Sequence, residues 1–222
     1  TCGDVGCDVA AGADITCGDV GCDVAAGADI TCGDVGCDVA AGADITCGDV
    51  GCSASAGANI NCGDIAGDVE SSGAISCQSI GGNVAGDVNT ELKISCDRIE
   101  GDASAKGEIV VTGDISGDVS ASDIFCNAID GDARGGKITC GRIEGDATSN
   151  GNITVTNNIS GDVSADIDVA CGQIGGDARG GKITCKNIEG DISSCNGDIH
   201  CQNIAGDVSC TGNIYYANSS EK

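Results

Sequence analysis

The sequence predicts an all-β fold, a single β-solenoid, and three features of the chain support that prediction. The first is a repeat of about 15 residues that runs through most of the 222 residues. The second is an alternation of apolar and polar residues inside each repeat, with the period of two that is typical of strands. The third is composition: with 38 Gly and three aromatic residues, the core has to be built from small and aliphatic side chains.

The repeat is perfect in the N-terminal part of the chain. Residues 1–15 read TCGDVGCDVAAGADI, the same letters recur at 16–30 and 31–45, and a drifted copy follows at 46–60. Looser copies continue to Ile214, which makes fourteen units. A fixed period of this kind is the signature of stacked repeats, so we expect about fourteen coils of about 15 residues.

Each unit has the pattern of short strands joined by tight corners. Apolar or small residues fall at unit positions 2, 5, 7, 9, 11, 13 and 15, and position 5 is Val or Ile throughout. The alternation slips only at the Gly-Asp pair of positions 3 and 4, as a corner requires. Each Gly would disfavour a helix by about 1 kcal/mol. We therefore predict a three-sided coil whose seven apolar positions face inward.

The solenoid is predicted to have three parts. Residues 1–60 are near-identical Cys-rich coils, residues 61–214 are degenerate coils of the same solenoid, and residues 215–222 are a C-terminal tail.

From residue 61 onward the units share an I-x-G-D-[VA] core and a closing G-x-I, in segments such as GDIAGDV, RIEGDASAKGEI and NISGDVSADIDV. This pattern resembles the bactofilins, polymer-forming cytoskeletal proteins of bacteria. The resemblance covers roughly 61–214 and, more weakly, the perfect repeats; the Cys-rich repeats depart from the family. It implies a right-handed, triangular β-solenoid that joins end to end into nucleotide-free, non-polar filaments.

Cysteine occupies position 2 in twelve of the fourteen units, and Val111 and Val155 occupy it in the other two. Val at this position indicates a buried site, in which a free thiol serves as a small core residue. Position 7 is Cys in the first four units and Gly in the others. Disulfides within a turn are the sharper prediction, because a tight corner can bring two Cα atoms within the roughly 7 Å that the bond allows.

The predicted pairs are Cys2–Cys7, Cys17–Cys22, Cys32–Cys37 and Cys47–Cys52, with Cys195–Cys210 as a further candidate. A bridge between stacked cysteines is less favoured, since parallel side chains point alike. A cysteine content of 18 favours an oxidising compartment. We therefore expect an extracellular or cell-surface protein, or a cytoplasmic filament if the thiols are reduced.

Aspartate recurs at positions 4, 8 and 14 of the first three units, and no Lys or Arg precedes Lys93. Stacking would place these like charges roughly 5 Å apart, which costs free energy unless they are screened or bridged. We expect the aspartates of positions 4 and 8 to cap backbone N–H groups at corners. Position 14 (Asp14, Asp29, Asp44) should point outward, where capping explains it poorly. A solvated acidic face and Ca²⁺ bound between turns are the interpretations there, and no other cofactor is expected.

Several function classes are disfavoured by the sequence. The net charge of −25 argues against nucleic-acid binding, and no run of 18 apolar residues suggests a membrane span. Neither a cleft-building loop nor a catalytic group surrounds His200, the only His, so we expect no enzyme and no small-molecule substrate. Ice binding is less favoured, because the chain has one short rank of threonines.

The ends of the repeat array suggest a function. A solenoid exposes unpaired backbone groups at its end turns, and isolated repeat proteins block them with a distinct cap. Here the first unit begins on a perfect repeat, and Tyr215 and Tyr216 are placed to cover the last core layer. We expect a structural protein that joins end to end with itself into a filament or fibre. The alternative is an acidic, disulfide-stitched extracellular solenoid that binds Ca²⁺ or a surface partner.

Overall fold

A computed structural model of the protein describes residues 1–82, 84–86, 93–194 and 196–216. These residues form short β-strands and no helix. The chain divides into two structural units, Thr1–Ile115 and Ser116–Lys222, each of which spans several sequence repeats. From here on, 'unit' means one of these two, and the residues of one repeat form one turn. In each unit, parallel strands stack as a β-solenoid with a spacing of about 15 residues, and the turns number about 13 in all. The predicted fold class is confirmed.

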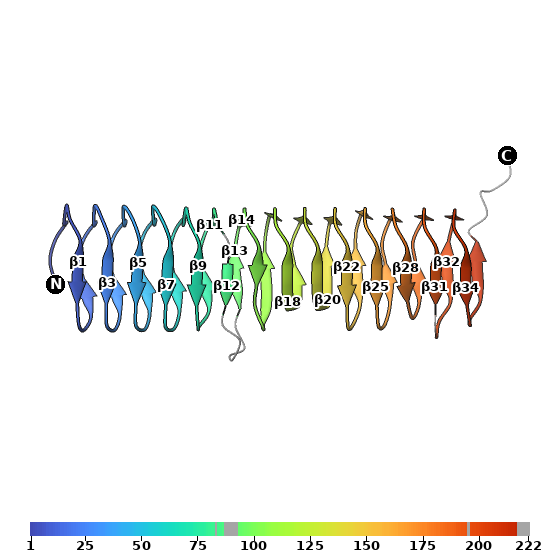
Figure 1. The fold of residues 1–222 in the computed structure, drawn as a ribbon, viewed down its shortest axis with the longest axis horizontal. Helices are drawn as coiled ribbons and strands as arrows, with labels where there is room; N and C mark the ends of the chain where they lie inside the picture. The colour runs from blue at the N-terminus through green and yellow to red at the C-terminus, as the bar shows by residue number, and fades with distance from the viewer. Residues whose placement is uncertain (83, 87–92, 195, 217–222) are drawn as a thin grey trace. The chain divides into compact units, whose positions relative to one another are not determined.

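Each turn of the first unit contributes three extended segments, and each segment pairs in parallel with its counterpart in the next turn (Figure 1). The first ladder is β1 (Val9–Ala11), β3 (Val24–Ala26), β5 (Val39–Ala41), β7 (Ala54–Ala56), β9 (Val69–Ser71), β12 (Val84–Gly86) and β15 (Ala103–Ser104). The second is β2 (Ile15–Thr16), β4 (Ile30–Thr31), β6 (Ile45–Thr46), β8 (Ile60–Asn61), β10 (Ile75–Ser76), β13 (Ile94–Cys96) and β16 (Glu108–Val111). The third begins as single bridges from Val5 to Ile80 and continues as β11 (Ser79–Ile80), β14 (Arg98–Ile99) and β17 (Asp114–Ile115).

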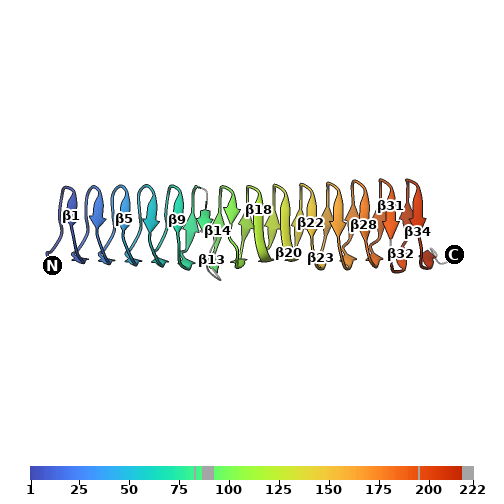
Figure 2. The ribbon, with the colours of Figure 1, turned by 60° about the horizontal axis from the view of Figure 1, so that its bottom comes forward.

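The second unit repeats this three-ladder plan (Figure 2). Its first two ladders are joined in β18 (Val119–Phe125) and β20 (Ala133–Cys140). The first then runs through β22 (Ala147–Ser149), β25 (Val163–Ala165), β28 (Ala178–Gly180), β31 (Ile192–Ser194) and β34 (Val208–Cys210). The second runs through β23 (Ile153–Val155), β26 (Val169–Ala170), β29 (Ile183–Thr184), β32 (Ile199–Cys201) and β35 (Ile214–Tyr216). The third is β19 (Ala128–Ile129), β21 (Arg142–Ile143), β24 (Asn158–Ile159), β27 (Gln173–Ile174), β30 (Asn187–Ile188) and β33 (Asn203–Ile204).

The core consists of the inward residues of the three ladders. In the second turn these are Val20, Val24 and Ile30, each at most 2% exposed. Because successive side chains in a strand point to opposite faces, the neighbouring Ala25 and Thr31 are exposed. Since the register is in phase with the repeat, every core residue lies on its counterpart in the next turn, as Ile15 lies on Ile30. Within each unit three columns of stacked apolar side chains result, mostly Val and Ile, with Ala at places such as Ala54 and Ala147.

The predicted inward face is only partly right. Positions 5, 9 and 15 are core, and positions 2 and 11 become buried further along the first unit, as at Cys47 and Ala56. Position 7 is not core: Cys7 and Cys52 are exposed. The reason is that the chain bends at positions 3, 6–7 and 12–13, so strand alternation does not carry through these positions. Three corners in each turn replace the single slip expected from the sequence.

Polar residues enter the core at position 11 when their hydroxyl groups are satisfied. Ser149, which is 2% exposed, donates to the carbonyl of Gly136 at 2.7 Å and accepts the N–H of Gly151 at 3.0 Å. Ser71 makes the equivalent contacts with Ala58 and Gly73. These hydroxyls tie the corner at positions 12–13 of one turn to the same corner of the turn before it.

Candidate functional site

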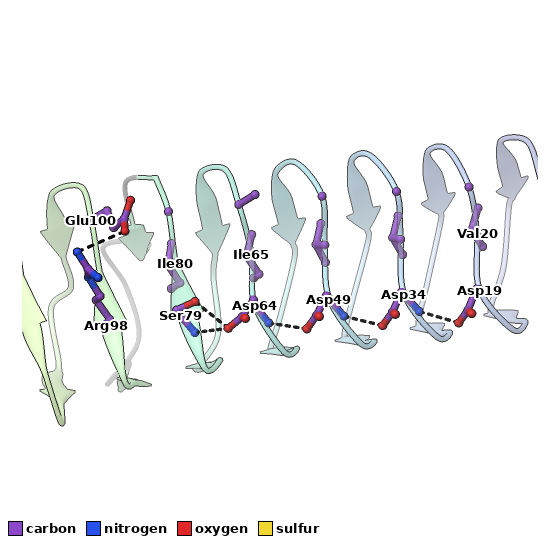
Figure 3. A pocket seen from close by; sticks show the side chains of 17 residues that line it. Asp19, Val20, Asp34, Asp49, Asp64, Ile65, Ser79, Ile80, Arg98 and Glu100 are labelled. Atoms are coloured by element: carbon purple, nitrogen blue, oxygen red, sulfur yellow. Dashed lines mark hydrogen bonds and ion pairs between the residues drawn. The ribbon is translucent and has the colours of Figure 1, made fainter.

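The most regular polar feature of the first unit is a column of aspartates at position 4 (Figure 3). The backbone N–H of Asp34 donates to Oδ1 of Asp19 at 3.0 Å, and Asp49 donates likewise to Asp34 at 2.9 Å. The N–H of Asp64 donates to Oδ1 of Asp49 in the same way. Ser79 ends the column, because it donates both its N–H and its hydroxyl to Oδ1 of Asp64. Each carboxylate therefore binds the next turn and not its own corner.

Positions 8 and 14 form the same kind of column. At position 8 of the second unit, the N–H of Asp162 donates to Asp146 at 2.7 Å, and the N–H of Asp177 donates to Asp162 at 2.8 Å. At position 14, the N–H of Asp29 donates to Oδ1 of Asp14 at 3.3 Å, and the N–H of Asp44 donates to Oδ1 of Asp29 at 3.1 Å. Capping of the backbone by positions 4 and 8 was expected, although within a turn. The expectation that capping explains position 14 poorly is wrong, because position 14 follows a bend and not the middle of a strand.

Asn replaces Asp in these columns without loss of the bond. The N–H of Ala74 donates to Oδ1 of Asn59 at 2.9 Å, and the N–H of Asp168 donates to Oδ1 of Asn152 at 3.1 Å. An amide oxygen therefore serves as well as a carboxylate oxygen. The role of the column is to accept a backbone N–H, and the negative charge is not needed for it.

A groove of about 760 Å³ follows the position-4 column in the first unit. Asp19, Asp34, Asp49 and Asp64 line it, together with the Val or Ile at position 5 and the Gly or Ala at position 6 (Figure 3). Arg98, the basic residue in the lining, pairs with Glu100 at 3.4 Å. The small residue at position 6 leaves this space open. Stacked carboxylates give it a negative field that attracts cations.

Among the described residues, no group of three or more His, Cys, Asp or Glu side chains is arranged to hold a metal ion. The proposed Ca²⁺ ligands Asp14, Asp29 and Asp44 lie in one column. Asp14 and Asp29 each accept the next aspartate's N–H on Oδ1, and Asp44 accepts the N–H of Asn59 there at 2.8 Å. Ca²⁺ binding by these three residues stays a prediction.

The cysteines also form columns along the stack. The eight cysteines of the predicted pairs within a turn, from Cys2 to Cys52, are free thiols in the structure. The sulfur contacts that it records join position 2 to position 2 of the next turn: Sγ of Cys47 lies 3.0 Å from Sγ of Cys62, and Sγ of Cys185 lies 3.3 Å from Sγ of Cys201. Disulfide formation within a turn stays a prediction, and the described contacts favour a different partner.

Two further predictions concern the C-terminal end: a disulfide between Cys195 and Cys210, and a cap made by Tyr215 and Tyr216. Cys195 lies outside the described residues, and Cys210 is a free, half-buried thiol that donates to the carbonyl of Gly197 at 3.5 Å. Tyr215 pairs with His200 and stacks on its ring, with 4.6 Å between the centroids. Tyr215 therefore lies on the outer face and does not cover the last core layer, because Ile214 is the inward residue of that strand. The side chain of Tyr216 lies outside the described residues.

The sequence contains no apolar run that suggests a membrane span, and no helix in the described part of the chain is long and apolar enough to cross a membrane. No protein-family model, curated protein or solved structure matches the chain. The structure supports a β-solenoid repeat protein, and no family match supports the resemblance to bactofilins in particular.

The hydrogen bonds of the aspartates at positions 4 and 8 were expected within a turn, and a bridge between stacked cysteines was disfavoured. Cys62 was not singled out as a site residue. The available signal was the perfect 15-residue period itself. In a parallel, in-register stack, each residue meets its own copy about 4.8 Å away. Any polar or sulfur group that recurs every 15 residues therefore has its counterpart as the nearest neighbour.

Replacing Asp29 by Asn tests what the position-14 column does. The Asn variant keeps the acceptor for Asp44 and removes one of three stacked charges, so we expect the free energy of unfolding to rise by about 0.2–1 kcal/mol. Asp29→Ala removes the acceptor and should lower the free energy of unfolding by about 1 kcal/mol. Urea titration with a chelator, and again with millimolar Ca²⁺, measures both. A wild type that Ca²⁺ stabilises, beside an Asn variant that it does not, would instead support Ca²⁺ binding between turns.

Proposed function

We propose that the protein is a structural repeat protein that assembles end to end, with the first turn of one copy stacked on the last turn of another. The observation that carries this proposal is that the contact between turns is nearly the same at each step. The N–H of Gly21 donates to the carbonyl of Val5 at 2.8 Å, and the N–H of Gly36 donates to that of Val20 at the same distance. In the first turn the corresponding group is the N–H of Gly6, which faces away from the second turn.

The two terminal surfaces are complementary in hydrogen bonding. Asp207 and Asn213 occupy positions 8 and 14 of the last turn, and each donates its N–H to the turn before it, at 2.8 Å. In the aspartate columns, each side-chain oxygen accepts the N–H of the equivalent residue in the next turn. The side-chain oxygens of Asp207 and Asn213 are therefore placed to accept N–H groups of a turn stacked after the last one. The first turn supplies the matching donors, the N–H groups of Asp8 and Asp14.

The apolar columns match as well. Val5 and Val9 are half-buried in the first turn, whereas Val20 and Val24 are at most 2% exposed one turn further on. At the other end, Ile204 and Val208 are half-buried and Ile214 is 40% exposed. Stacking would bury these residues in the columns that they already belong to. Because the two surfaces differ, the contact is head to tail, and it gives a filament when successive copies do not close into a ring. Such a filament is polar, unlike the non-polar filaments that the resemblance to bactofilins implies.

Association should depend on protein concentration and on salt. A net charge of −25 opposes the approach of two copies, and salt screens that repulsion over about 8–10 Å near physiological ionic strength. Sedimentation velocity of the full chain should show species that grow in mass with concentration and grow further with added salt. A single species of 21.5 kDa under all these conditions would rule the proposal out.

A matched pair of variants locates the contact. Val9→Lys puts a charge into the apolar column at the first turn, a device by which natural edge strands avoid pairing. Ala10→Lys adds the same charge to the exposed outer face of the same strand. We expect Val9→Lys to weaken association at least tenfold and Ala10→Lys to leave it within twofold of the wild type. Equal association of the two variants, with unchanged circular dichroism, would place the contact elsewhere.

A further inference from the structure

The position-2 cysteines make two close sulfur contacts that no role described so far requires. Cys47 and Cys62 are 9% and 8% exposed, and their sulfurs lie 3.0 Å apart. In the second unit, Cys185 and Cys201 are 7% and 2% exposed, and their sulfurs lie 3.3 Å apart. Both pairs join adjacent turns, because the partners are 15 and 16 residues apart in the chain.

The backbone geometry of these pairs suits a covalent bond. In-register parallel strands place equivalent Cα atoms about 4.8 Å apart, inside the range of about 4.4–6.8 Å that disulfides span. Parallel side chains leave their backbones in the same direction, but the two thiols have turned toward each other. Closing the gap therefore needs a small movement of side chains and no change of the backbone register.

We propose that Cys47–Cys62 and Cys185–Cys201 are sites of reversible disulfide formation between adjacent turns, with a low-molecular-weight disulfide as the oxidant. A thiolate of the pair attacks the reagent, forms a mixed disulfide and releases one thiol of the reagent. The second thiolate attacks the protein sulfur of the mixed disulfide and releases the other. Two cysteine thiols are oxidised, one reagent disulfide is reduced to two thiols, and the two cysteine protons go to the released thiolates.

The columns also provide an entry for the reagent. Cys32 is half-buried and lies in the same column as Cys47, and Cys171 is half-buried in the column of Cys185. Hydrogen bonding between sulfurs of the column lowers the pKa of the Cys32 and Cys62 thiols and raises the pKa of Cys47. A mixed disulfide also forms at the more accessible thiol; the next sulfur of the column attacks its protein sulfur, forms a protein disulfide and releases the reagent thiol. The third sulfur of the column then attacks the second, forms the inter-turn pair and releases the first cysteine as a thiol. Oxidation passes inward by exchange between neighbouring sulfurs.

The test is oxidation of the reduced full chain with oxidised glutathione, followed by alkylation in acid, cleavage at Asp and peptide mass spectrometry. Cleavage before Asp49 and Asp64 puts Cys47 in one peptide and both Cys52 and Cys62 in the next. Fragmentation of the linked peptides identifies the partner of Cys47. We expect that partner to be Cys62, and we expect a second linked pair of peptides that joins Cys185 to Cys201.

Two substitutions taken from the chain's own repeats provide the controls. Cys62→Val uses the residue found at position 2 in Val111, and Cys52→Gly uses the residue found at position 7 in Gly67. We expect Cys62→Val to reduce the link between the Cys47 peptide and the peptide that begins at Asp49 at least tenfold, and Cys52→Gly to leave that link within twofold. The Cys185–Cys201 link should persist in both variants, which shows that they are folded.

The opposite pattern, loss of the link in Cys52→Gly and its survival in Cys62→Val, would overturn the proposal in favour of pairing within a turn. It would also be overturned if Cys32 and Cys171 took up glutathione and neither inter-turn link appeared. Neither result bears on end-to-end assembly, since that proposal rests on the terminal turns.

Discussion

Replacement of Ile153 by Ala is expected to lower the free energy of unfolding by about 2–5 kcal/mol, the usual cost of removing a buried Ile side chain. Ile153 is fully buried and lies between Ile138 and Val169 in one column of the second unit. Stability in a repeat array is carried by contacts between neighbouring turns, so a gap in one column weakens the contacts on both sides of it. Urea unfolding followed by circular dichroism measures the loss.

The matched control is Ile153→Val. Val169 already occupies the next place in the column, so this variant should cost only about 0.5–1.5 kcal/mol. Hydrogen exchange should rise for the amides of the turns that hold Ile138 and Val169 in the Ala variant. An Ala variant as stable as the Val variant would show that the columns do not carry the stability of the fold.

Alkaline pH is expected to destabilise the reduced protein, because its buried thiols resist ionisation. Burial raises the pKa of Cys77 and of Cys96 from 9.0 to about 12. The unfolded thiols ionise near pH 9 while the folded ones keep their protons, so unfolding releases protons between pH 9 and about 12. The full stabilisation is present below pH 9 and falls as the pH rises, by about 1.4 kcal/mol per pH unit for each thiol.

The double variant Cys77→Val, Cys96→Val isolates this effect. Val stands at the same position in Val111 and Val155 and does not titrate, and both are 2% exposed. Unfolding by urea at a series of pH values between 8 and 11, with reductant present, should show a shallower loss of stability in the variant. Parallel curves for wild type and variant would mean that these thiols ionise freely in the folded protein.

The fold was predictable because the period of two and the period of 15 agree. Val20, Val24 and Ile30 were all assigned to the inner face, and all three are core. The inward assignment of Cys52 was wrong, since bends at positions 6–7 and 12–13 interrupt the alternation. Strand alternation indicates a face only within one straight segment, and the sequence marks the second and third corners only by a Gly that also appears elsewhere.

The candidate sites were less predictable for a related reason. Cys47 was assigned a partner within its turn, and Asp14 was assigned to a solvated face or to Ca²⁺ between turns, whereas both make direct contacts with the next turn. The residue types pointed to hydrogen bonding and to sulfur chemistry. The period of 15 residues places equivalent side chains of adjacent turns next to each other, but whether a side chain bonds within its turn or to the next turn depends on its rotamer, which the pattern of residues does not encode.

The most direct test of end-to-end stacking is diffraction from aligned assemblies of the full chain. If copies stack as their own turns do, the spacing of about 4.8 Å between parallel strands lies along the fibre axis, and electron microscopy shows fibres one solenoid wide. That is the result we predict. A spacing of about 4.8 Å perpendicular to the fibre axis, or particles of single-chain size at every concentration, would contradict the account.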